Sequence, residues 1–275
     1  MSTGLCSACG RNPRRHPIQF TGEVLCDGCF RNRFVERVRG TINRYRLLSP
    51  RSRIVVGVSG SPESIALAKV TWELESRYEG ARISFIHVLR WGNEEEADAI
   101  EDAFRRLHMP TAKLKPISLK EKRGFYLSEL VDENVITRVG ICMACRLLVP
   151  STLTIEVARA GGDVIAYGDT ADELAEEALY MLSAERYEKM VNVAAKRDLA
   201  GGRFCRVLPL SHALKAEARG YLSTFGYHLD YACPYVDVKK EVFSGLTAKL
   251  EAKKPGSAFS AIGSFLNLAE VLRQR

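Results

Sequence analysis

The sequence has no apolar run that approaches the roughly 20 residues a membrane-spanning helix needs. Its first residues, MSTGLCSACG, contain no hydrophobic segment of the kind found in secretion signals. Internal repeats and low-complexity segments are also absent. Hydrophobic residues make up 46% and charged residues 27% of the 275 residues, which is ordinary for globular proteins. We therefore expect a cytoplasmic globular protein of one large or two small domains.

Negative charge is scarce at the start of the chain. Residues 1–53 contain eleven arginines and three acidic residues, although the net charge of the whole chain is only +7. The remaining residues are thus close to neutral. Arginine binds phosphate oxygens through paired N–H groups and releases counterions from nucleic acids. The pattern indicates phosphate contacts, and the alternative is a basic surface exposed to solvent.

Six of the eight cysteines form three C-x-x-C pairs. Two of these pairs, Cys6/Cys9 and Cys26/Cys29, are separated by sixteen residues, a spacing typical of a tetrahedral zinc site. Disulfides are the alternative, and they are disfavoured in a chain without an export signal. Residues 1–30 are therefore predicted to be a zinc ribbon.

The third pair, Cys142 and Cys145, is joined much later in the sequence by Cys233. Three cysteines cannot complete a four-ligand structural zinc site. They could hold a metal or cluster with one open position, or form a redox pair with a resolving thiol. The sequence pattern alone leaves both possibilities open.

Hydrophobic periodicity predicts an amphipathic, arginine-rich helix at residues 31–48 and an alternation of strands and helices after it. This alternation indicates an α/β protein with a doubly wound parallel sheet, followed by a mostly helical C-terminal region. Strands are expected at residues 54–58, 83–89, 113–117 and 163–167. The expected divisions are 1–30, the ribbon; 31–52, a basic linker helix; 53–204, a nucleotide-binding domain; and 205–275, the helical region.

The loop after the first long strand is rich in small residues and reads Ser59-Gly60-Ser61-Pro62-Glu63-Ser64. Such a loop lets backbone N–H groups at a helix start approach an anion. Ser61 as N-cap and Pro62 in the first turn also suit a well-capped helix with no ligand. The loop is not a Walker motif, because the G-K-[ST] sequence is missing.

Together these motifs resemble the PP-loop ATP pyrophosphatases that introduce 2-thiouridine into tRNA, in the archaeal and eukaryotic group with an N-terminal zinc ribbon. The resemblance covers nearly the whole chain, and its motifs follow the family's order. The motifs that carry the resemblance are the paired C-x-x-C motifs with the arginine-rich helix, Val-Gly-Val-Ser-Gly, the central C-x-x-C, Tyr167–Glu176, Leu208-Pro-Leu210 and Cys233-Pro-Tyr235. No cysteine follows Cys233, so we expect no counterpart of the family's second, C-terminal ribbon in this sequence.

The resemblance implies an adenine nucleotide alpha hydrolase-like fold and a two-step reaction. ATP with Mg²⁺ adenylates the C2 oxygen of a uridine, and sulfur then displaces AMP. It implies pyrophosphate binding by Ser59, Gly60, Ser61, Ser64 and Gly168, Mg²⁺ binding by Glu63 and Asp172, and a [4Fe-4S] cluster on Cys142, Cys145 and Cys233. The same three cysteines could instead act as persulfide- and disulfide-forming thiols. Implied tRNA contacts are Arg31, Arg33, Arg37, Arg39, Arg44 and Arg46.

The sequence departs from the family at several ATP-site positions. Ser61 and Glu63 replace a glycine and an aspartate of the loop, and Leu89-Arg90-Trp91 replaces an acidic stretch. The family's His-Asn pair is replaced by Asp169-Thr170, and a basic residue by Val149. An alternative is therefore a non-catalytic homologue that binds tRNA or accompanies an active thiolation subunit. Family partners would be a ubiquitin-like sulfur carrier and a second subunit, in a homodimer or heterodimer.

Overall fold

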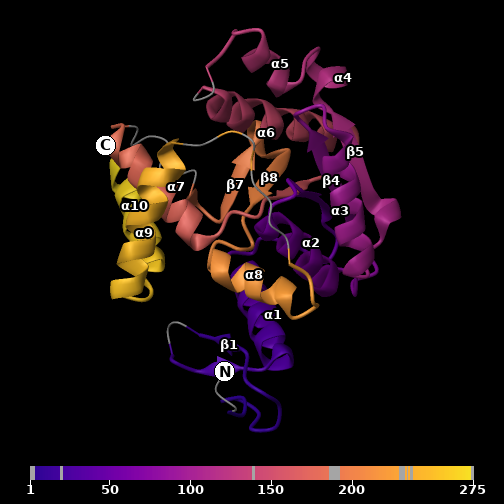
Figure 1. The fold of residues 1–275 in the computed structure, drawn as a ribbon. Coiled ribbons are helices and arrows are strands. Elements are labelled where there is room, and N and C mark those ends of the chain that lie inside the picture. Colours follow the sequence, from indigo (N-terminus) through magenta and orange to yellow (C-terminus); the bar gives the residue numbers. More distant parts are fainter. Residues whose placement is uncertain are drawn as a thin grey trace.

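The protein is described here from a computed structural model (Figure 1). It describes residues 4–18, 21–137, 140–185, 193–228, 233, 235 and 238–273. One six-stranded sheet lies at the centre, with strand order β5-β4-β3-β6-β8-β7. Its strands are β3 (Arg53–Gly57), β4 (Arg82–Leu89), β5 (Leu114–Ser118), β6 (Val164–Ala166), β7 (Lys196–Leu199) and β8 (Phe204–Val207).

The predicted α/β class is confirmed, but the sheet is mixed and not wholly parallel. Strands β3, β4, β5, β6 and β8 are parallel, whereas β7 pairs antiparallel with β8. The β7–β8 hairpin was not predicted, because both strands are only four residues long and β7 is largely polar. Strand β8 also spans the position between residues 204 and 205 at which a domain boundary was expected.

Helices cover both faces of the sheet, as the doubly wound prediction requires (Figure 1). Strand β3 explains this, because Ile54, Val56 and Val58 belong to one hydrophobic cluster and Val55 to another. A strand buried on both sides needs apolar residues on both faces, and the central Ile54-Val55-Val56 of β3 provides them. The helices after β3 are α2 (Pro62–Glu75), α3 (Glu94–Arg106), α4 (Leu119–Arg123), α5 (Leu127–Asp132), α6 (Ile141–Arg159), α7 (Ala171–Ser183), α8 (Lys215–Ser223), α9 (Val238–Lys253) and α10 (Ser257–Arg273).

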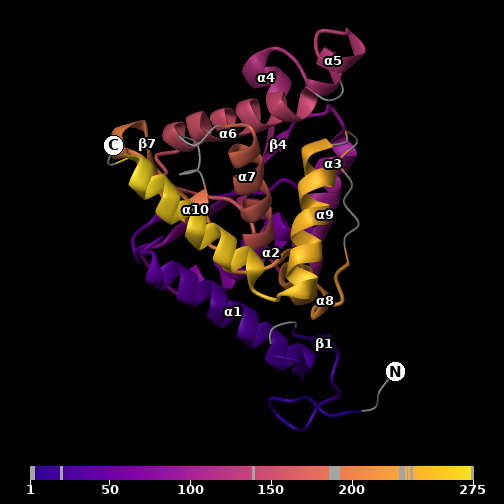
Figure 2. The ribbon, with the colours of Figure 1, turned by 90° about the vertical axis from the view of Figure 1, so that its left-hand side faces the viewer.

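The two faces carry different parts of the chain. Helices α4, α5 and α6 lie on one side, and α2, α8 and α1 (Asp27–Arg44) lie on the other (Figure 1). Helices α9 and α10 pack against α7 at the side of the molecule (Figure 2). The C-terminal helices are therefore part of the main body.

Helix α6 begins at Ile141, four residues before its predicted start, and so includes the central C-x-x-C pair in its first turns. Its 19 residues have the length and apolar composition of a membrane span, a feature the search for apolar runs did not predict because charged residues interrupt the segment. Ile141, Leu153 and Val157 of α6 are nevertheless buried in the cluster that covers the sheet. We therefore assign α6 to the core of the α/β domain.

The N-terminal part is a two-stranded hairpin of β1 (His16–Pro17) and β2 (Val24–Leu25), followed directly by α1. Helix α1 starts at Asp27, inside the second C-x-x-C pair and four residues earlier than predicted. Phe34 of α1 stacks on Tyr221 of α8 with ring centroids 4.6 Å apart. The Tyr221 hydroxyl donates to Glu73 of α2 at 2.8 Å, so one side chain ties three helices together.

We expect Phe34→Ala to lower the free energy of unfolding by about 3–4 kcal/mol, because the substitution empties a fully packed aromatic site. Asn32→Ala, an exposed position on the same helix, is the control and should change it by less than about 0.5 kcal/mol. Urea unfolding followed by circular dichroism measures both. A loss below about 1 kcal/mol for Phe34→Ala would show that α1 is not anchored through this contact.

Candidate active site and metal centre

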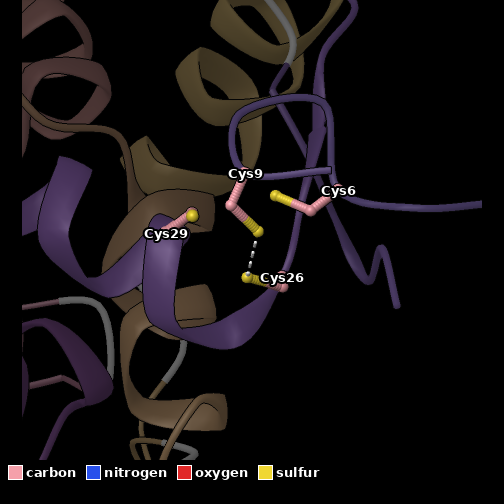
Figure 3. Close-up of side chains that lie close together, drawn as sticks. All are labelled: Cys6, Cys9, Cys26 and Cys29. Carbon is pink, nitrogen blue, oxygen red and sulfur yellow. Dashed lines mark hydrogen bonds between the residues drawn. The ribbon is translucent and has the colours of Figure 1, made fainter. Parts of the chain in front are cut away.

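The four N-terminal cysteines form one compact cluster (Figure 3). Their sulfur atoms all lie within 4.8 Å of one another, and the Sγ atoms of Cys9 and Cys26 are 3.9 Å apart. Tetrahedral zinc with Zn–S bonds of about 2.3 Å places its sulfurs about 3.8 Å apart. Cys6 and Cys9 come from a turned loop, and Cys26 and Cys29 from the start of α1. The donor set and spacing fit a single metal ion.

The thiols of this cluster influence one another's protonation. Burial raises the pKa of Cys6, but hydrogen bonds with the backbone of Cys26, Cys9 and Ala8 outweigh it and bring the pKa to about 6. Hydrogen bonding to Cys26 and burial raise the pKa of Cys29 to about 12. Four thiols so close together cannot all ionise without a compensating cation, which a bound metal would supply.

The loop between β3 and α2 is held by a network of three serine hydroxyls. The Ser59 hydroxyl donates to Ser61 and to Ser64, at 3.2 Å in each case. The Ser64 N–H donates to the Ser61 hydroxyl at 3.3 Å, which makes Ser61 the N-cap, as expected. Gly60 has a positive φ of 87°, a conformation that favours glycine. The loop is therefore preformed, with its hydroxyl groups facing one another.

A second loop, after β6, closes on the first. A Cβ atom added at Gly168 would lie 3.1 Å from the Glu63 carbonyl and from the Ser64 Cα. Only glycine permits this approach without a shift of the backbone. From β3 the chain adds β4 and β5 on one side of the sheet and then returns to add β6 and β8 on the other. The loops after β3 and β6 therefore meet at the point where the strand order reverses, and α/β sheets bind ligands at such points.

A pocket of about 640 Å³ opens at this edge of the sheet. The loop residues Ser59, Ser61, Glu63 and Ser64 line it together with Gly168. Cys142, Cys145 and Cys233 also line it. The structure thus brings the predicted nucleotide loop and the three separate cysteines into one cavity.

The three pocket cysteines differ from the N-terminal four in their environment. Cys142 and Cys145 are one turn apart on α6 and half-buried, whereas Cys233 is exposed. Burial raises the pKa of Cys145, although the positive charge of Arg90 opposes the rise. Among the described residues, only the N-terminal cysteines gather within metal-ligand distance of one another. The pocket cysteines offer three sulfur donors beside an open space.

Two buried side chains, His87 of β4 and Arg90 just after it, hold the start of the serine loop through backbone carbonyls. The carbonyl of Val58 accepts from His87 Nδ1 at 2.8 Å, and the carbonyl of Ser59 accepts from Arg90 Nη2 at 3.3 Å. Arg90 is itself paired with Glu96 at 3.1 Å, with both side chains less than a tenth exposed. Burial lowers the pKa of His87 to about 4, so this imidazole is neutral at pH 7.

Asp172, expected from the resemblance to bind Mg²⁺, is hydrogen-bonded to the start of α8. Its carboxylate accepts from the backbone N–H of Lys215 at 3.1 and 3.3 Å, and so caps the start of α8. Burial raises the pKa of Asp172, while hydrogen bonding from Thr170 and the charge of Lys215 oppose the rise. Glu173 and Asp169, on either side of Asp172 in sequence, are the carboxylates of this segment that line the pocket.

Positive charge reaches the pocket from residues that the sequence analysis did not single out as site residues. Arg90, Arg146, Lys215 and Arg219 all line it. Arg219 Nε lies 3.5 Å from the buried Glu63 carboxylate. Because α8 is far from the loop in sequence, no spacing rule could have identified Lys215 or Arg219. The pocket is thus lined by cationic side chains although Val149 itself is apolar.

The arginines of α1 fall into two groups. Arg31 donates to the Thr224 carbonyl at 2.8 Å and lies 3.9 Å over the Phe225 ring, while Arg37 pairs with Glu217 of α8 at 3.2 Å. These two fix α1 to the main body. Arg33 and Arg39 pair with local glutamates, and Arg44 and Arg46 are exposed.

Comparison with known proteins gives consistent relatives along nearly the whole chain. The tRNA-5-methyluridine(54) 2-sulfurtransferase of Pyrococcus horikoshii is 27% identical over 95% of this chain and 81% of its own length. Cytoplasmic tRNA 2-thiolation protein 1 of Xenopus laevis is 26% identical over 96% of this chain and 78% of its own. The sequence matches no family model.

Among solved structures, the U34-tRNA thiolase NcsA of Methanococcus maripaludis, determined with its [4Fe-4S] cluster, has a TM-score of 0.80 at 22% identity. The match covers 98% of this chain and 88% of that chain. At this identity the match establishes the fold. It confirms the PP-loop ATPase architecture expected from the motifs.

We expect the purified protein to contain one zinc ion per chain and Cys26→Ser to lose it, because three thiolates bind zinc far more weakly than four. Cys205→Ser, which changes a cysteine of β8 outside both sites, is the control and should keep the metal. Elemental analysis measures the content. Retention of a full zinc equivalent in Cys26→Ser would contradict the assignment.

His87 should make stability depend on pH. Its pKa is lowered from about 6.5 in the unfolded chain to about 4, so the unfolded state binds the proton first. The neutral His87 side chain makes its full contribution to the free energy of unfolding above pH 6.5. This contribution is lost as the pH falls toward 4. Between pH 7 and pH 5 the loss should be about 2 kcal/mol. Unfolding curves of the wild type and His87→Gln should differ by this amount in their pH dependence, and parallel curves would contradict the prediction.

Proposed function

From its homology to tRNA 2-thiolation proteins along nearly its whole length, we propose that this protein is an ATP-dependent tRNA 2-sulfurtransferase of the PP-loop group. The observation that carries the proposal is the single pocket that contains the serine loop, three cysteines and four cationic side chains. Adenylation acts on the C2 oxygen of the base, and sulfur transfer acts on the C2 carbon bonded to that oxygen. The serine loop and the three cysteines must therefore lie at one site.

The loop would bind the pyrophosphate end of ATP. Its N–H groups and the hydroxyls of Ser59, Ser61 and Ser64 provide donors at a helix start, where an anion is stabilised. Glu63 supplies a carboxylate for Mg²⁺, and the mutual pairing of Glu63 with Arg219 would have to loosen when the ion binds. Asp172 acts by positioning α8, from which Lys215 and Arg219 face the phosphates.

Cys142, Cys145 and Cys233 are the residues that would hold a [4Fe-4S] cluster. Sulfur is the usual donor to iron, and three thiolates leave one coordination position open. When bound, such a cluster can carry sulfide at the open iron. The half-burial of Cys142 and Cys145 on α6 would limit access of water, while Cys233 is exposed.

In the proposed reaction the C2 oxygen of a tRNA uridine attacks the α-phosphate of ATP, and pyrophosphate leaves. Sulfide then adds to C2, and AMP leaves with the former C2 oxygen. Negative charge develops on the phosphates in the first step and on AMP in the second. Arg90 and Arg146 line the pocket between the loop and the cysteines and would stabilise this charge.

The tRNA backbone would contact the outer surface of α1. Arg44 at the end of this helix and Arg46 in the turn after it are exposed, and Arg39 is half-exposed beside Glu36. Arg31 and Arg37 contribute indirectly, because they fix the helix to α8. A ubiquitin-like sulfur carrier and a homodimer or a heterodimer with an active homologue stay predictions from the family resemblance.

Anaerobically purified protein, incubated with ATP, Mg²⁺, sulfide and an unmodified tRNA transcript, should release AMP and pyrophosphate and form 2-thiouridine. Mass spectrometry of digested tRNA measures the product. Tight tRNA binding without nucleotide turnover would contradict the proposed enzymatic activity and favour a non-catalytic homologue. The Glu63–Arg219 pair and the apolar Val149 are the observations that support this alternative.

Cys142→Ala should lose most of its iron and labile sulfide and all thiolation activity, because one of three cluster ligands is removed. Its zinc content should be unchanged, since the N-terminal cluster is separate. Iron, sulfide and zinc analysis of the anaerobic variant measures all three. Full iron content in Cys142→Ala would exclude these cysteines as cluster ligands.

A further inference from the structure

The segment Arg90-Trp91, which follows β4, enters the pocket between the serine loop and the cysteines. Its backbone is fixed by α5, because the Leu127 N–H donates to the Arg90 carbonyl and the Ser128 hydroxyl donates to the Trp91 carbonyl, each at 2.8 Å. The two side chains are therefore presented by a rigid segment. The proposed reaction assigns a role to Arg90 but none to Trp91.

Trp91 forms an aromatic pair at the cysteine end of the pocket. Its ring centroid lies 4.8 Å from that of Tyr235, at an interplanar angle of 38°. Tyr235 follows Cys233 by two residues, and both residues line the pocket. Aromatic side chains in an RNA-binding site provide faces on which an unstacked base can lie.

The indole N–H of Trp91 is a second sign of a ligand. Nε1 is buried and, among the described residues, has no hydrogen-bond acceptor. A buried donor without an acceptor is costly to a folded protein, so such groups are rare unless a water or ligand completes them. A pyrimidine base offers carbonyl oxygens as acceptors.

We propose that Trp91 and Tyr235 form the binding face for the extruded target uridine of the tRNA, with the Trp91 N–H donating to the base. This inference rests on the proposed function. The position favours the target base over the adenine of ATP, because sulfur must reach the target and the aromatic pair adjoins Cys233. The Arg90 guanidinium, held by Glu96 and the Ser59 carbonyl, is the neighbouring cation.

The chain has only two tryptophans, so Trp72→Phe leaves Trp91 as the sole tryptophan. Addition of an unmodified tRNA transcript to this single-tryptophan protein should quench its fluorescence, as expected for a base stacked on the indole. AMP or ATP without tRNA should leave the signal unchanged. Equal quenching by AMP alone would overturn the proposal, because the face would then belong to adenine.

Variants of Trp91 separate stacking from hydrogen bonding. Trp91→Ala should lower kcat/KM for tRNA by roughly tenfold or more, the effect of losing one stacked base. Trp91→Phe keeps a ring and should restore most of that loss, with the wild-type iron content and melting temperature. The matched control is the Trp72→Phe background, which changes a tryptophan outside the pocket.

Failure of the inference can be told apart from failure of the proposed function. If the wild type forms no 2-thiouridine, the function itself is wrong. If the wild type is active and Trp91→Ala retains the wild-type kcat/KM for tRNA, the aromatic face is not a base-binding site. A loss of iron or of thermal stability in Trp91→Ala without recovery in Trp91→Phe would assign Trp91 a packing role and overturn the proposal.

Discussion

The close contact between Gly168 and the first turn of α2 fixes the arrangement on which the pocket depends. It joins the loops after β3 and β6, the two neighbouring strands from which the chain builds the sheet in opposite directions. His87 and Arg90 support the same loop from the β4 side through the carbonyls of Val58 and Ser59. Contacts from three adjacent strand ends thus hold one short segment, so its donors are in place before any ligand arrives.

Some arginines of the basic N-terminal part attach α1 to the rest of the protein, and others are exposed to solvent. The sequence alone could not tell the two groups apart. Arg31 and Arg37 use their charge to attach α1 to α8, together with the Phe34–Tyr221 stack. Helix α8 in turn carries Lys215 and Arg219 into the pocket. The helix that ends at the exposed Arg44 is therefore connected, through α8, to the cations that face the proposed ATP phosphates. The surplus of arginine at the start of the chain thus serves the fold as well as the proposed RNA surface.

Much of the fold followed from local patterns. The apolar run at residues 54–58 predicted a strand buried on both faces, and the C-x-x-C spacing predicted the four-cysteine cluster, because short-range chemistry determines both. The antiparallel β7 strand was missed, since Lys196–Leu199 is largely polar and gains its place only by pairing with β8. Lys215 and Arg219 were missed because only tertiary packing brings α8 to the loop. The hydrogen bond from the Lys215 N–H to Asp172 depends on the same packing, and the Mg²⁺ role of Asp172 stays a prediction. Asp169, Glu173 and the buried Arg90–Glu96 pair likewise emerge only once the strand ends are side by side.

The central claim is that one pocket contains both the nucleotide loop and the sulfur-bearing cysteines. Anomalous diffraction at the iron and zinc edges, from anaerobic crystals soaked with ATP and Mg²⁺, tests it most directly. The account predicts an iron peak beside Cys142, Cys145 and Cys233, a zinc peak among Cys6, Cys9, Cys26 and Cys29, and nucleotide phosphates on the Ser59–Ser64 loop in the same cavity as the iron. Iron at the N-terminal cysteines, or a nucleotide bound outside this pocket, would contradict it.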